Sequence, residues 1–74
     1  MPSPFAARTL EIFERIIEFN IQNHKYALMQ RAEPFLITIL SQQTEILKQA
    51  KISLRQEAEA EGLLPVQTPA DPPH

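Results

Sequence analysis

Five polar side chains interrupt the apolar pattern near the middle of the chain and could bind a ligand or a proton. They are Asn20, Asn23, His24, Gln42 and Gln43. Buried polar residues of this kind fix the register and oligomeric state of coiled coils, so we expect them to form a hydrogen-bonded polar layer. Because imidazole titrates near neutral pH, a small-ligand or pH-sensing site around His24 is an alternative hypothesis. A third is a solvent-exposed break in the pattern.

Three basic residues, Lys48, Lys51 and Arg55, form a stripe that could contact phosphate groups. Without neighbouring aromatic side chains, such a stripe is a weak signal for nucleic-acid binding. Folding the chain about residue 33 brings the stripe level with three acidic residues. The expected pairs are Glu11 with Arg55, Glu14 with Lys51, and Glu18 with Lys48. We therefore interpret the stripe first as a set of ion pairs.

Three glutamates, Glu57, Glu59 and Glu61, follow the basic stripe. Negative charge at the C-terminal end of a helix opposes the helix macrodipole and encourages fraying. We interpret these residues as a solvated helix end, and an acidic docking patch for a basic partner is the alternative.

No arrangement of residues predicts catalysis, a metal site or a cofactor site. The 74-residue chain has no cysteine, one glycine and two histidines. That composition excludes disulfides and glycine-rich phosphate loops, and it leaves no zinc-ligand spacing. We therefore predict that the protein is not an enzyme and holds no cofactor or metal.

The residues that must position these side chains are predicted to form two long helices. From Phe5 up to Gly62 the chain has a single proline, Pro34, and is rich in good helix formers. Ser3 and Pro4 form a favoured helix start, and Gly62 is a natural helix stop. The predicted domain covers residues 1–61, with helices over about 4–31 and 34–61.

Pro34 divides this helical region into two parts. Proline inside a helix costs roughly 3 kcal/mol and pushes the preceding residue, Glu33, out of the helical conformation. The chain is therefore either a tight antiparallel hairpin or one long kinked helix. The opposite charges that meet in the folded arrangement favour the hairpin. The predicted fold class is all-α, an antiparallel two-helix hairpin.

The first helix is apolar over more than half of its circumference, which predicts self-association. A helix beside one neighbour needs a stripe of only roughly 100°, so this helix needs two neighbours or more. About sixty residues also make a marginal single-chain core. The simplest closure is a dimer of hairpins, a four-helix bundle with the first helix at its centre. The expected interface residues are Phe5, Ile12, Ile16, Phe19, Tyr26, Leu10, Phe13, Ile17, Ile39 and Ile46.

The rest of the chain suggests where the protein acts. Residues 62–74 are proline-rich and are predicted to form a flexible tail. A net charge of −2 supplies no broad positive field for nucleic acid. The apolar runs are too short to span a bilayer, and the start lacks the features of a signal peptide. We expect a cytoplasmic protein.

The predicted function is that of a homo-oligomeric interaction module, such as an adaptor, regulator, inhibitor or accessory subunit. It would bind itself and another protein through the apolar faces of the first helix. A nucleic-acid-binding bundle dimer is one alternative. Residues 42–49, Gln-Gln-Thr-Glu-Ile-Leu-Lys-Gln, resemble helical segments of phasins, the granule-coating proteins. That resemblance implies a second alternative, in which the first helix binds a hydrophobic granule or lipid surface.

Overall fold

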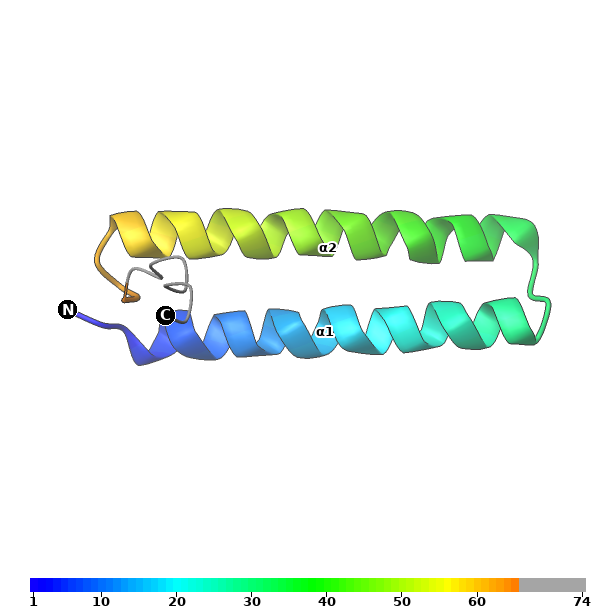
Figure 1. The fold of residues 1–74 in the computed structure, drawn as a ribbon, viewed down its shortest axis with the longest axis horizontal. Coiled ribbons are helices and arrows are strands. Elements are labelled where there is room, and N and C mark those ends of the chain that lie inside the picture. Colours follow the sequence, from blue (N-terminus) through cyan, green and yellow to red (C-terminus); the bar gives the residue numbers. More distant parts are fainter. Residues whose placement is uncertain (66–74) are drawn as a thin grey trace, which may run out of the picture.

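The chain folds into two antiparallel helices of nearly equal length. The computed structural model describes residues 1–65, in which α1 spans Pro4–Met29 and α2 spans Pro34–Ala60. The two helices lie side by side along their whole length, joined by a short turn (Figure 1). The hairpin prediction is therefore confirmed, and the single kinked helix is wrong. Most of the predicted tail, residues 66–74, lies outside the described part of the chain.

The starts of the two helices differ in how they are capped. At the start of α1 the Ser3 hydroxyl accepts a hydrogen bond from the backbone N–H of Ala6 at 3.3 Å, as the sequence predicts. The start of α2 has no side-chain cap, and Glu33 leads into Pro34 with an extended backbone. Both helices begin with a proline, which lacks an N–H and so leaves one donor fewer to satisfy at each start.

Both helices end with the same backbone motif. The second residue after each helix has a positive φ, 53° at Arg31 and 73° at Gly62. The backbone N–H of Ala32 then donates to the carbonyl of Ala27 at 2.9 Å, and the Leu63 N–H donates to Ala58 at 2.8 Å. This is the bonding pattern of a Schellman motif, which favours glycine at the position of positive φ. Gly62 was predicted from this preference, whereas the arginine gives no such signal.

The contact between the helices follows a heptad pattern in each of them. The seam residues recur at alternating spacings of three and four, which is the pattern of a coiled coil. All of them are buried or half-buried, but no large side chain in residues 1–65 is completely buried. The seam comprises Ala6, Leu10, Phe13, Ile17, Asn20, His24 and Ala27 of α1, with Ile37, Leu40, Thr44, Leu47, Lys51, Leu54 and Ala58 of α2.

The register between the helices is defined by one side-chain hydrogen bond. The amide of Asn20 donates to the hydroxyl of Thr44 at 2.8 Å, and these residue numbers add up to 64. Residues whose numbers add up to about 64 therefore lie level across the hairpin. This register places every seam residue of α1 level with a seam residue of α2. The open end of the hairpin is closed by the Ser3 N–H, which donates to the Leu63 carbonyl at 2.7 Å.

Candidate functional site: an apolar face across both helices

One side of the hairpin carries large apolar side chains from both helices, which we call the apolar face. Their exposed fractions lie between 40% and 79%, so they are not covered by the hairpin itself. Contiguous exposed apolar surface of this kind marks an interaction site more often than scattered residues do. The apolar face comprises Phe5, Ile12, Ile16, Phe19 and Tyr26 of α1, with Leu36, Ile39 and Ile46 of α2.

The heptad spacing explains why these residues share one side. In both helices the members of the apolar face immediately precede seam residues, as Phe19 precedes Asn20 and Leu36 precedes Ile37. One step back along an α-helix is a turn of about 100°. Because the helices are antiparallel, that step turns both of them toward the same side of the hairpin. Asn23 and Tyr26 accordingly line one shallow groove together with residues of α2.

The ten predicted interface residues divide into two groups in the structure. Leu10 and Ile17 are buried and Phe13 is half-buried, because all three belong to the seam between α1 and α2. The other seven are exposed and lie on the apolar face. The sequence prediction did not include Leu36 in its interface, although Leu36 precedes a seam residue and lines the same groove as Tyr26. The seam therefore uses only part of the apolar surface of the chain.

The predicted polar layer forms with a different partner. The Asn20 amide donates to the Thr44 hydroxyl and to the Leu40 carbonyl at 3.1 Å, and Thr44 is buried. The expected neighbours, Gln42 and Gln43, are exposed instead. The difference arises because the seam of α2 runs through position 44. The heptad spacing of the neighbouring apolar residues is the signal that could have found it.

The two other residues of the predicted layer lie apart from this hydrogen bond. His24 is half-buried at a seam position, level with Leu40, whereas Asn23 is exposed at the edge of the apolar face. Within residues 1–65 neither side chain makes a hydrogen bond. The structure thus gathers only Asn20 and Thr44 into a bonded pair, and it does not assemble a ligand site around the imidazole.

The opposite side of the hairpin is charged, and one of the three predicted cross-helix ion pairs forms there. Lys51 Nζ lies 3.2 Å from Glu14 Oε1. The other two predicted pairs are wrong, because Lys48 pairs with Glu45 and Arg55 with Glu59 along α2. Their expected partners in α1 lie about 50° further around the helix than Glu14, by the heptad geometry, and so point away from α2.

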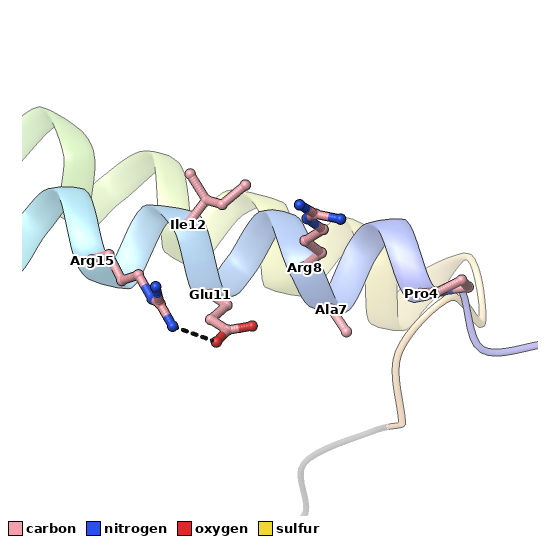
Figure 2. Close-up of a pocket in the computed structure, with 6 residues that line it drawn as sticks. All are labelled: Pro4, Ala7, Arg8, Glu11, Ile12 and Arg15. Carbon is pink, nitrogen blue, oxygen red and sulfur yellow. Dashed lines mark hydrogen bonds and ion pairs between the residues drawn. The ribbon is translucent and has the colours of Figure 1, made fainter.

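The outer edge of the apolar face is basic along α1. Figure 2 shows Arg8 and Ile12 extending to the same side of α1, whereas Arg15 extends to the other side, toward Glu11. Arg15 Nη2 lies 3.1 Å from Glu11 Oε1, one turn earlier, while Arg8 makes no ion pair within the described residues. The hollow drawn there is lined by residues of one helix and is shallow. It is a rim of the apolar face and has no enclosed volume in which to hold a ligand.

The acidic residues at the end of α2 lie at the same end of the molecule as this basic edge. Glu57 and Glu61 are exposed and line a groove with Phe5 and Thr9 of α1. Glu59 instead points to the charged side, where it pairs with Arg55. The three glutamates therefore do not form one patch.

Neither described helix is long and apolar enough to cross a membrane. No group of acidic residues, histidines or cysteines in residues 1–65 is arranged to hold a metal ion. Comparison with models of known families finds no match, and comparisons with curated proteins and with solved structures find none either. The apolar face is therefore the feature on which a functional proposal rests.

Proposed function

We propose that this chain is a non-enzymatic protein-interaction module that associates with a second copy of itself through the apolar face. One observation carries the proposal: the hairpin leaves more large apolar side chains exposed than it buries. Among the described residues, the only large apolar side chains that are buried belong to Leu10 and Ile17. Burying apolar surface contributes roughly 25 cal/mol per Å², so an uncovered face of eight large side chains is a strong drive toward association.

The size of the hairpin supports the same conclusion. Chains of about sixty structured residues bury little surface and are only marginally stable, and disulfides, metals or oligomerisation commonly add the missing stability. This chain has no cysteine, and its described residues hold no metal-binding group. Covering the apolar face with a second hairpin would produce a four-helix bundle, the arrangement that long antiparallel hairpins commonly adopt. Two charged sides would then face outward, available to another protein.

The alternative of a nucleic-acid-binding dimer has less support from the ion pairs. Lys48, Lys51 and Arg55 each lie within 4 Å of a glutamate carboxylate, at 3.6, 3.2 and 3.7 Å. Binding a phosphate backbone would require these cations to exchange a carboxylate for a phosphate, with no net gain in opposite charge. We therefore place self-association ahead of nucleic-acid binding.

Light scattering on two double variants tests the proposal. Ile16→Gln with Phe19→Gln removes apolar area from the centre of the face while keeping good helix formers. The wild type is expected near twice the chain mass of 8.5 kDa, and this variant near 8.5 kDa with reduced helicity. A control with Glu18→Gln and Lys25→Gln keeps the net charge and alters exposed residues away from the face, so it should remain dimeric.

A wild type that scatters as a folded monomer at tens of micromolar would overturn the proposal. So would a dimer that survives the loss of Ile16 and Phe19, because the association would then use another surface.

A further inference from the structure

We propose that the second copy docks with its turn at the same end of the bundle, so that each α1 packs on the α2 of the other copy. This inference rests on the proposed self-association and adds its symmetry and register. A two-fold axis parallel to the helices relates the two hairpins, and a rotation about such an axis leaves heights along the bundle unchanged. Residues that lie level within one hairpin therefore also lie level across the dimer.

The outer edges of the two helices match under this symmetry. Four residues of α1 and four of α2 recur at intervals of seven on the edges of the hairpin furthest from the seam, and all are exposed. Within one hairpin these edges lie on opposite sides and cannot touch. In the proposed dimer they meet, and the register that adds residue numbers to 64 brings polar residues level with polar ones and apolar residues level with apolar ones. The level pairs are Arg8 with Gln56, Arg15 with Gln49, Gln22 with Gln42, and Met29 with Phe35.

The two ends of this edge each suit the proposed dimer, one through complementary charges and the other through apolar contact. Arg8 has no ion pair within the described residues, and its level position on the second copy is next to the exposed Glu57. Opposite charges facing each other across an interface favour this pairing over alternatives. At the other end, Met29 and Phe35 are 76% and 62% exposed in the hairpin and would cover each other.

The centre of the apolar face matches in the same way. Ile16 and Phe19 lie at the height of Ile46 of the second copy, so apolar side chains meet apolar ones. Asn23 lies near the height of Gln43 of the second copy, so the exposed amides of the face also meet each other. Tyr26 lies at the height of the second copy's Leu36 and Ile39, which it already adjoins within one hairpin.

The other symmetric arrangement fits less well. A two-fold axis perpendicular to the helices would pack α1 on α1 with its direction reversed. Centred on the middle of α1, it would bring Arg15 toward Arg15 of the second copy, so that like charges meet. It would also reverse α2, whose members of the apolar face all lie in the half near the turn. Ile39 would then face the second copy's Glu57.

Cysteine cross-linking distinguishes the two arrangements, because the natural chain contains no cysteine. Gln22→Cys and Gln42→Cys chains are prepared separately, mixed in equal amounts to exchange subunits, and treated with a short bismaleimide. We expect the mixture to yield a covalent dimer containing one chain of each kind, and each variant alone to yield only background. The matched control mixes Glu18→Cys with Lys48→Cys, which point to the outward charged sides and should not cross-link between copies.

Efficient cross-linking of an Arg15→Cys chain to itself, with none in the mixed pair, would overturn the proposed symmetry and leave self-association intact. Light scattering on each variant before cross-linking separates the two failures, because a chain that is monomeric at that stage contradicts the proposed function itself.

Discussion

Asn20 and Thr44 are joined by a 2.8 Å hydrogen bond across the seam, and the Thr44 hydroxyl also donates to the Leu40 carbonyl at 2.8 Å. The first of these bonds connects the two helices, and the second lies within α2. A shift of either helix by one heptad would separate the Asn20 amide from the Thr44 hydroxyl and from the Leu40 carbonyl, and the amide would lose both partners in α2. Buried polar groups without partners cost about 1–3 kcal/mol, so the pair selects one register of the hairpin.

The first prediction concerns this pair. Thr44→Val leaves the Asn20 amide with one partner fewer, so we expect the free energy of unfolding to fall by about 1 kcal/mol. Combining Thr44→Val with Asn20→Leu replaces both polar groups by apolar ones, and we expect stability at or above that of the wild type. Urea unfolding of the wild type, the single variants and the double variant gives the coupling energy. Strictly additive effects would show that the bond does not form in solution.

The second prediction compares the two helix ends. Gly62 has a φ of 73°, and no neighbouring atom lies close to where a Cβ would be. Gly62→Ala therefore causes no clash, and its only cost is that alanine must adopt a left-handed backbone conformation. We expect a loss of about 1 kcal/mol. Arg31 adopts a similar conformation with a side chain, so Arg31→Gly should gain up to about 1 kcal/mol. Thermal unfolding of both variants provides the measurement, and effects of equal sign would contradict the assignment of two matching motifs.

The third prediction concerns the open end of the hairpin, where the Ser3 N–H donates to the Leu63 carbonyl at 2.7 Å. Leu64 is half-buried there and adjoins Leu10 of α1. A chain that ends at Gly62 loses both interactions, whereas a chain that ends at Pro65 keeps them. We expect the shorter chain to melt several degrees lower, since about 1 kcal/mol corresponds to roughly 4–8 °C for a domain of this size. Equal melting temperatures would show that this contact adds no stability.

The local signals in the sequence predicted the helices and their ends well. Ser3 and Gly62 act within a few residues of themselves, through a side-chain cap and a left-handed backbone, so their effects can be recognised without knowing the fold. Pro34 likewise interrupts the helix through its own ring and missing N–H. The left-handed Arg31 was missed because arginine has no preference for that conformation, and the turn imposes it.

Tertiary structure decided which side chains meet. The sequence alone indicated that α1 has more apolar surface than one neighbour can cover, because helical periodicity depends only on residue order. It did not separate Ile17, which is buried in the seam, from Ile16, which is exposed on the apolar face. A rotation of α1 by one residue would exchange these roles, and only packing against α2 selects the rotation.

The same limit explains the polar layer and the ion pairs. Folding the chain about residue 33 placed the two helices within one turn of their true register, which was enough to pair Glu14 with Lys51. It was not enough to choose Thr44 over Gln43 as the partner of Asn20, since one residue turns a helix by about 100°. Sequence thus determined the elements, their ends and their amphipathic character. The rotation of each helix about its own axis, and with it the composition of the apolar face, was decided by the burial of the seam residues of α1 against those of α2.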